Sequence, residues 1–423
     1  MNSFRKIPIS RRKTLTGMGA LGAAGLLPRM AIGQGQTLVI NSNVNNPESR
    51  ALLERMTAAF GKEFGCSVTI NTTDPESYKT TIRNFLVTSP PDVCFWYSGE
   101  RMRHFVRLGL FEDVTDVWEK HGFYEPTGAL ADSVTVDGRQ YGVPTEAAFI
   151  GIFYRKDLFE RAGIGQPPAT WDELMAAGEA LKKAGITPFA IGSRDLWPTG
   201  YFFDYINLRT NGLDFHMRLM AGQEAYTDPR VIKVFDRWAE LVSAGFFTPN
   251  HTSYSWEQGA TFFSQGQAGM IFLGQFARRF LPQEVIANTG FFPFPTLDPN
   301  VPQYEEFTAN SMHVPSGAGN KELGKEFLAY FYRPENLQEW IVPEGYLPPR
   351  KDVEITFMDE LLQSGLDMLA KAEGTAQFYD RDTNPEMAQI GMNGFQEFMV
   401  DPSRRDSILE RLEAARKRIF EVQ

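Results

Sequence analysis

The sequence predicts an α/β fold built on a parallel sheet, because segments typical of strands and helices alternate from residue 37 onward. Strands are expected at residues 37–40, 68–70 and 92–96, with helices at 47–64 and 78–87 between them. The chain of 423 residues is longer than one hydrophobic core usually supports, so two domains are expected. Sheets of this kind bind ligands just beyond the carboxyl ends of their strands.

The first helix is marked at both ends and along its buried face. Asn46 is placed to cap it, Pro47 suits its first turn, and Gly65 suits its end. Apolar residues recur between these points at helical spacing: Leu52, Leu53, Met56, Phe60 and Phe64.

The rest of the chain continues this mixture without internal repeats. Residues 170–173 read Thr-Trp-Asp-Glu, a capping box that predicts a helix ending at Gly185. The other expected elements are a hairpin-like turn at 136–144, a strand at 147–154, a helix at 228–245, a strand at 269–273, an extended segment at 290–295 and mostly helices from 321.

Residues 1–33 have the pattern of a secretory signal: paired arginines at Arg11 and Arg12, a short apolar run, and small residues before Gly33. The twin arginines indicate the Tat route and a periplasmic protein cleaved near Gly33. An apolar run of about 13 residues is too short for a membrane span, which needs ~20 helical residues. The GxGxxG at residues 17–22 lacks the acidic residue that follows in a dinucleotide site, so no cofactor is expected.

The chain beyond residue 33 is acidic. The six basic residues of the signal reduce 42 Lys and Arg to 36, against 52 Asp and Glu, which gives a formal charge of −16. This charge argues against nucleic acid or an anionic membrane as the partner, since both require a basic surface. No segment beyond residue 33 has the ~18 consecutive apolar residues of a membrane-spanning helix.

The two cysteines are expected to be free thiols. The first strand should lie between the strands near Cys66 and Cys94, which separates them by roughly 9–10 Å. A disulfide requires Cα atoms within about 7 Å, although an oxidising compartment makes it the alternative. The five histidines show no metal-ligand spacing, so no metal site is expected.

Six segments of the chain are each similar to a motif of one protein family, and they occur in the same order as in that family: Pro91–Trp96, Asp137–Pro144, Tyr154–Phe159, Pro168–Leu174, Phe262–Met270 and Asn320–Leu328. The second, third and fourth are similar to the motifs DGK-YGVP, YNKDLF and PP-TWDEL. Together they make the chain resemble the periplasmic solute-binding proteins of carbohydrate ABC transporters, the group around maltose-binding protein. Each motif is weak alone, but six in order argue against chance.

The resemblance implies a periplasmic-binding-protein type II fold, with two discontinuous α/β lobes joined by a hinge and the ligand cleft between them. The implied lobes are residues 34–146 with 295–332 (N-terminal) and residues 147–294 with 333–423 (C-terminal). The implied crossings between the lobes lie near Thr145–Ala148, Phe292–Pro295 and Tyr332–Glu335.

Sugars are bound by aromatic rings, which stack on the apolar face of the sugar, and by planar polar side chains, which bond its hydroxyls. Asn43 and Asn45 follow the first strand, and Trp96 and Tyr97 end the third, where such a sheet binds ligands. The alternatives are turn chemistry for the asparagines and packing under a helix for Trp96.

The resemblance implies roles for further residues. A ligand-contacting Trp followed by an acid–arginine pair matches Trp96, Glu100 and Arg101, although one inserted residue separates the pair from Trp96 here. Glu146 matches a hinge Glu that reaches the sugar, and its alternative is an exposed hinge carboxylate.

Aromatic residues later in the chain match other parts of the implied cleft. Trp197 matches the Trp of a cleft Trp-Pro pair, and Phe276 stands where the family usually has a stacking Trp. Trp256 is a further stacking candidate, with core packing as its alternative. Tyr346 and Arg350 lie in a loop that often lines the cleft; Arg350 suits a carboxylate, sulfonate or phosphate, or is an ordinary surface arginine.

The implied function is a monomeric, non-enzymatic receptor that captures a carbohydrate and delivers it to a membrane permease. An exported carbohydrate-active enzyme is the first alternative, but no carboxyl pair and no GxSxG, HExxH or CxxC motif stands out. The second alternative is the same fold binding a small anion or a polyamine. Residues 380–382 read Asp-Arg-Asp, either a ligand-contacting loop or an ion-paired one.

Overall fold

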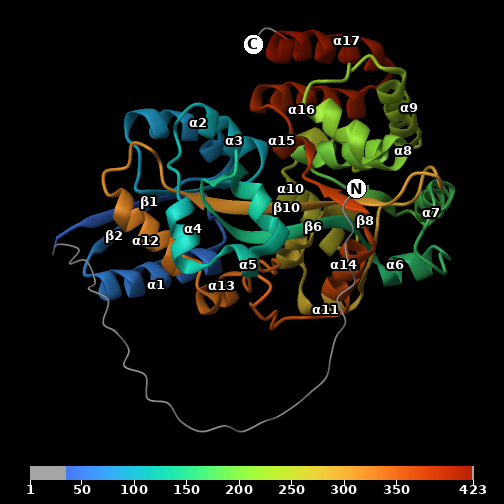
Figure 1. Cartoon of the computed structure of the whole chain (residues 1–423). Coiled ribbons are helices and arrows are strands. Elements are labelled where there is room, and N and C mark those ends of the chain that lie inside the picture. The colour runs from blue at the N-terminus through green and yellow to red at the C-terminus, as the bar shows by residue number, and fades with distance from the viewer. Residues whose placement is uncertain (1–34, 422–423) are drawn as a thin grey trace, which may run out of the picture.

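The computed structural model describes residues 35–421, so the expected signal segment lies outside the described residues. A nine-stranded sheet crosses the molecule in the order β2-β1-β3-β10-β6-β8-β7, with β11 beside β10 and β9 beside β6 (Figure 1). Its strands are β1 (Thr37–Ser42), β2 (Ser67–Thr72), β3 (Val93–Tyr97), β6 (Val143–Arg155), β7 (Thr187–Ala190), β8 (Ala268–Gly274), β9 (Thr289–Phe292), β10 (Tyr304–His313) and β11 (Gly374–Ala376). A separate hairpin joins β4 (Thr135–Val136) to β5 (Arg139–Gln140).

Helices cover both faces of the sheet (Figure 1). They are α1 (Pro47–Phe64), α2 (Pro75–Thr88), α3 (Glu100–Arg107), α4 (Thr115–His121), α5 (Tyr124–Thr127), α6 (Lys156–Arg161), α7 (Trp171–Lys183), α8 (Gly200–Met220), α9 (Pro229–Ser243), α10 (Trp256–Ser264), α11 (Gln283–Ala287), α12 (Lys321–Phe331), α13 (Pro334–Trp340), α14 (Glu360–Lys371), α15 (Tyr379–Asp382), α16 (Pro385–Val400) and α17 (Arg405–Arg416).

The predicted α/β start is confirmed. Strand β1 pairs in parallel with both β2 and β3. Asn46 caps α1 by accepting hydrogen bonds from the next two backbone amides after Pro47, and Gly65 ends it with φ +71°. Helix α2 begins earlier than predicted, because Asp74 caps it and Pro75 occupies its first position.

The strand order also confirms the free cysteines. β1 lies between β2 and β3, so Cys66, just before β2, and Cys94, within β3, are not on neighbouring strands. Both are free thiols, and burial raises the pKa of each. The turn before β6 is a two-residue hairpin in which Asp137 and Gly138 both have positive φ, as tight hairpins require.

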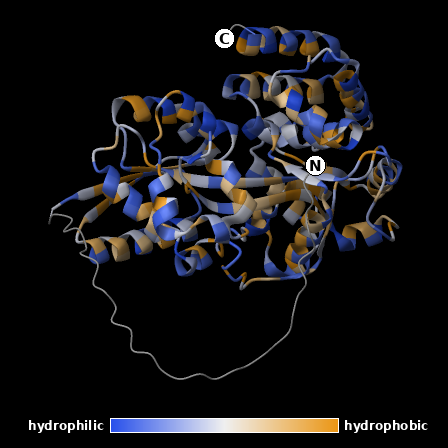
Figure 2. Cartoon of the chain, in the orientation of Figure 1, coloured by the Kyte–Doolittle hydropathy of each residue, from blue (hydrophilic) through white to orange (hydrophobic). Residues whose placement is uncertain are grey.

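The buried apolar residues form two hydrophobic clusters. The first cluster lies around β1–β3, α1, α12 and α13, and the second around β6–β9, α8, α9 and α16. Strands β6 and β10 run from one to the other: Val143 belongs to the first cluster and Ala147 to the second. Surface helices such as α16 and α17 show both hydrophilic and hydrophobic residues along their length (Figure 2).

Three chain segments connect the clusters. On β10 the change falls between Phe307, which packs on the second cluster, and Met312, in the first. The third link is the segment between Ile341, in the first cluster, and Leu362, in the second. Within it, the backbone of Leu347 exchanges two 2.9 Å hydrogen bonds with Ala147. Near the segments named from the resemblance for these last two links, Phe294 packs in the second cluster and Leu337 in the first. The exact lobe limits remain a prediction.

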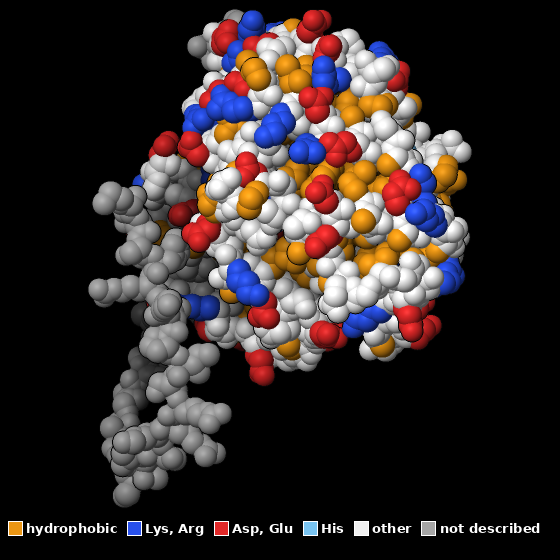
Figure 3. Space-filling view, turned by 90° about the vertical axis from the view of Figure 1, so that its right-hand side faces the viewer, with side chains coloured by type: hydrophobic (Ala, Val, Ile, Leu, Met, Phe, Trp, Pro, Cys, Tyr) orange, Lys and Arg blue, Asp and Glu red, His pale blue; other side chains and the backbone are white. Residues whose placement is uncertain are grey.

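Figure 3 shows one face of the molecule at full side-chain volume. Apolar side chains gather in the middle of this face, and Lys and Arg side chains lie beside Asp and Glu side chains. Charges of both signs are therefore mixed on this face.

Candidate functional site

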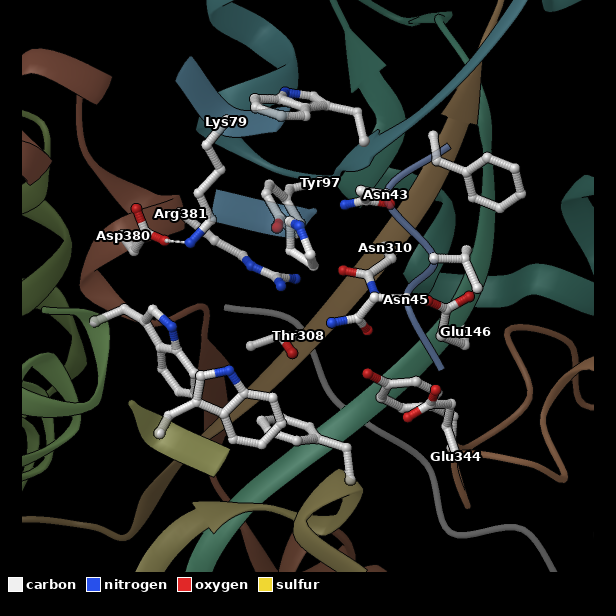
Figure 4. A pocket seen from close by; sticks show the side chains of 18 of the residues that line it. Asn43, Asn45, Lys79, Tyr97, Glu146, Thr308, Asn310, Glu344, Asp380 and Arg381 are labelled. Atoms are coloured by element: carbon white, nitrogen blue, oxygen red, sulfur yellow. Dashed lines mark hydrogen bonds and ion pairs between the residues drawn. The ribbon is translucent and has the colours of Figure 1, made fainter. Parts of the chain in front are cut away.

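A cavity of about 160 Å³ lies between the two clusters and takes its wall from both (Figure 4). It opens at the carboxyl ends of β1 and β3, where a sheet of this kind binds ligands. Nine of the twelve candidate ligand residues line it: Asn43, Asn45, Trp96, Tyr97, Glu146, Trp197, Trp256, Phe276 and Tyr346.

Aromatic rings around the second cluster form one wall of the cavity. Trp197 precedes α8, Trp256 begins α10, and Phe276 follows β8. The ring centroids of Trp197 and Trp256 are 5.5 Å apart, and those of Trp256 and Phe276 are 5.6 Å apart with their planes at 89°. Phe378 continues the wall at 6.4 Å from Trp197. The result is a stepped apolar surface facing the cavity.

Trp96 both lines the opposite wall and packs in the first cluster. It is 3% exposed, and its ring lies 4.9 Å from Tyr97 and 5.6 Å from Phe105. Its indole Nε1 is buried with no hydrogen-bond partner among the described residues. Both readings of this residue therefore have structural support: packing under a helix and contact with the cavity.

Glu146 lies on β6, directly opposite Asn310 on β10. Its carboxylate accepts a hydrogen bond from Asn310 Nδ2 at 2.5 Å and from Trp340 Nε1 at 2.8 Å. Burial raises the pKa of Glu146, and these hydrogen bonds act against that rise. The residue is buried in the cavity wall, not an exposed hinge carboxylate.

The side chains of the two asparagines after β1 line the cavity without a protein partner among the described residues. The turn there uses other groups: Ser42 Oγ accepts from the Val44 amide, and Asn46 caps α1. The side chains of Asn43 and Asn45 make no hydrogen bond to the described part of the chain and lie at the cavity (Figure 4). Turn chemistry does not account for these two amides.

The carboxylates of Asp380 and Glu344 lie on opposite sides of the cavity (Figure 4), and each is in an ion pair. On one side, Asp380 pairs with Arg101 and lies 3.7 Å from Lys79. Burial disfavours the Asp380 carboxylate, but these cations outweigh that penalty and hold its pKa at about 2. On the other side, Glu344 pairs with Arg279 and accepts a 3.1 Å hydrogen bond from Ser49 on α1.

Three candidate residues lie outside the cavity wall. Glu100 pairs with Arg107 on the same helix, and Arg101, also on α3, pairs with Asp380 and donates to its backbone oxygen. Arg350 pairs with Asp352 and stacks near Phe123 and Tyr332, so it holds its own loop in place. Each of these three side chains therefore contacts other residues of the protein and does not line the cavity.

Several cavity residues were not among the sequence candidates: Lys79, Tyr201, Arg279, Thr308, Asn310, Trp340, Glu344 and Phe378. Asp380 and Arg381 also line the cavity, and they belong to the segment 380–382 for which the sequence left a ligand-contacting and an ion-paired loop open. Thr308 and Asn310 are two apart on β10, so both face the cavity, but β10 itself was not predicted. The others are brought in by helix and loop packing that leaves no local signal.

Within residues 35–421, no group of three or more His, Cys, Asp and Glu side chains is placed to hold a metal ion. In the same range, no helix combines the length and apolar character needed to cross a membrane.

Residues 43–338, more than half of the chain, match the family model for bacterial extracellular solute-binding proteins. The chain belongs to this family. An uncharacterized ABC transporter extracellular-binding protein of Pyrococcus horikoshii is 28% identical to it over 337 residues, which cover 77% of this chain and 74% of the relative. A probable sugar-binding periplasmic protein of Mesorhizobium japonicum is 25% identical over 66% of this chain and 67% of the relative.

Not all family members are matched over their whole length. In a second extracellular-binding protein of P. horikoshii, the chain covers 65% of the relative at 24% identity.

Solved structures of the family share the whole fold. The bacterial solute receptor AcbH, described as having an exclusive preference for β-D-galactopyranose, is 27% identical with a TM-score of 0.85, covering 92% of this chain and 100% of that one. A chitin oligosaccharide binding protein is 24% identical with a TM-score of 0.86 and the same coverage. The expected α/β fold of maltose-binding-protein-like receptors is thereby confirmed.

Proposed function

We propose that this solute-binding protein captures a carbohydrate in the cavity between its two clusters and delivers it to an ABC permease. The observation that carries the proposal is the composition of the wall. One side offers the rings of Trp197, Trp256 and Phe276, and the other offers the planar amides of Asn43 and Asn45. Stacking and in-plane hydrogen bonding are the two means by which sugars are held.

Unpartnered polar atoms support a hydroxyl-rich ligand. Trp96 Nε1 and Asn310 Oδ1 belong to cavity residues, are buried, and have no partner among the described residues. Each such group costs ~1–3 kcal/mol when it stays unpaired. A ligand hydroxyl that reaches these atoms when the cavity opens offsets this cost, and an apolar ligand does not.

The cavity carboxylates favour binding over hydrolysis. A glycosidase needs one carboxyl group to give up a proton and another to attack or to activate water. Here both oxygens of Glu146 accept hydrogen bonds, Glu344 is engaged by Ser49 and Arg279, and Asp380 is engaged by Arg101. These carboxylates therefore serve as acceptors and ion-pair partners in the proposal.

The remaining parts of the proposal extend it to export, oligomeric state and hinge closure, and the sequence and the family support them. The protein is exported to the periplasm by the Tat-like signal of residues 1–33 and acts there as a monomer without enzymatic activity. β6, β10 and the Leu347 link form the hinge on which the two lobes close over the sugar.

A sugar screen with the protein of residues 34–423 tests this function. Ligand at 100 times its Kd stabilises the native state by ~2.7 kcal/mol, which raises Tm by several degrees. We expect at least one sugar to raise Tm, to bind in a 1:1 ratio by calorimetry and to be recovered unchanged by chromatography. Conversion of the sugar would support an enzyme, and a response only to polyamines or simple anions would contradict the carbohydrate.

A further inference from the structure

Three cations line the cavity, and their partners differ. Lys79 donates to Glu76 at 3.0 Å and approaches Asp380, and Arg279 pairs with Glu344. No carboxylate of the described residues lies within ion-pair distance of Arg381, although Arg381 also lines the cavity. Each carboxylate of the wall is in turn already engaged, as the preceding sections describe for Glu146, Glu344 and Asp380.

The Arg381 guanidinium is held firmly without an ionic partner. It lies 4.4 Å from the ring centroid of Tyr97 and 4.8 Å from that of Phe378, one from each cluster. Its Nη1 donates a 2.9 Å hydrogen bond to the backbone oxygen of Ala309. In Figure 4 the side chain extends from the side of Asp380 toward Asn310 and Asn45.

These contacts leave one edge of the guanidinium unused. Nε is buried and has no hydrogen-bond partner in the described part of the chain, and Nη2 makes no hydrogen bond to a described residue. Because Nε is buried here, a ligand reaches both donors only when the cavity opens. Nε and Nη2 form the two-donor edge that matches a carboxylate with two parallel hydrogen bonds. Asp380 attracts Arg381 from beyond ion-pair distance, so a ligand carboxylate in direct contact with the guanidinium supplies a closer counter-charge and gains affinity there.

We propose that the ligand is an acidic sugar, a hexuronate or a short oligosaccharide that contains one, whose carboxylate pairs with Arg381. This inference rests on the proposed carbohydrate function and names the chemical class within it. The sugar ring meets the aromatic wall of Trp197, Trp256 and Phe276, and the acid group meets Arg381 across the cavity. Arg350, the anion-binding candidate from the sequence, does not serve, because Asp352 neutralises it.

A matched panel tests the class of ligand. D-glucuronate, D-galacturonate and their short oligomers are compared with glucose, galactose and the equivalent neutral oligomers, by thermal shift and calorimetry. We expect a uronate ligand to bind at least about tenfold more tightly than its neutral counterpart. Sugar phosphates, inorganic phosphate and sulfate are included, because tighter binding of any of these than of uronates would overturn the carboxylate assignment.

Variants of Arg381 test the residue. We expect R381Q to weaken uronate binding at least about tenfold and to leave any neutral-sugar affinity unchanged. R381K retains the charge without the two-donor edge, so its uronate affinity should lie between those of the wild type and R381Q. R381K also tests the residue if R381Q folds poorly. Arg237→Gln, at an exposed position on α9, is the matched control and should bind like the wild type.

The outcomes separate this inference from the function on which it rests. If neutral sugars bind as tightly as uronates, or if R381Q weakens both classes equally, the acidic-sugar inference is wrong and the carbohydrate function stands. If no sugar of either class binds, both are wrong.

Discussion

Trp96 and Trp256 both line the cavity, but Trp96 is more deeply buried in its hydrophobic cluster than Trp256. Trp256 is partly buried, with its ring beside Trp197 and Phe276 of the cavity wall and beside Phe280 behind it. We expect W256A to weaken sugar binding by ~1–3 kcal/mol and to change the free energy of unfolding little. We expect W96A to reduce both, with a stability loss of ~3–5 kcal/mol, because Trp96 also fills the first cluster.

Calorimetric titration and urea unfolding of the two variants distinguish these effects. Trp238→Ala is the control for stability, because Trp238 is fully buried in the second cluster and does not line the cavity. It should lower stability and leave the affinity of the remaining native protein unchanged. If W256A binds as the wild type does, the aromatic wall does not hold the ligand.

For single residues, the sequence predicts which residue types line the cavity better than it predicts which other residues they contact. The aromatic candidates reach the cavity because their places in the chain match a known pattern. The sequence left a ligand role and an ordinary role open for both Arg350 and Arg381, and only the structure distinguishes them. Asp352, two residues away, neutralises Arg350, while Arg381 packs between Tyr97 and Phe378. Contacts across almost 300 residues, such as Tyr97 with Arg381, leave no local signal.

Helices α3 and α15 join the two clusters beside the cavity through Arg101 and Asp380. The Asp380 pKa of about 2 is below the ~3.9 of an unfolded chain. The pair therefore contributes stability that is fully present above about pH 4 and is lost as the pH falls toward about 2. The linkage amounts to roughly 2–3 kcal/mol.

We expect D380N to be less stable than the wild type at pH 7, because it leaves Arg101 buried without its counter-charge. The difference in free energy of unfolding between the wild type and D380N should become smaller as the pH falls from 4 to 2. The wild type loses the contribution of the carboxylate in this range, whereas the amide of D380N does not titrate. Urea unfolding at pH 7, 5, 4 and 3 measures this difference. Asp214→Asn, at an exposed pair with Arg218, should show almost no gap at any pH. A gap of D380N that is constant over this range would contradict the assignment.

Elements with local end signals were predicted well, and β10 was missed. The caps and glycines of α1, α7 and α9 lie within a few residues of the predicted ends. Strand β10 carries the buried polar residues Glu305, Glu306 and Ser311, so it lacks the alternation that marks a strand. Because β10 supplies Thr308 and Asn310, part of the cavity wall was missed with it.

Both clusters contribute to the cavity wall, so a sugar that contacts Trp96 and Trp256 together holds the two lobes at one separation. We expect ligand to shift the protein toward a closed form, since only that form makes both sets of contacts. Small-angle scattering should give a smaller radius of gyration with saturating ligand than without it. An unchanged radius would favour a preformed pocket.

The crystal structure of the protein with the sugar that raises Tm most is the measurement that tests the central claim most directly. We predict one sugar between the two clusters, with a ring face on the aromatic wall of Trp197, Trp256 and Phe276 and its hydroxyls on Asn43, Asn45 or Asn310. A ligand bound elsewhere on the molecule, with this cavity empty, would contradict the account.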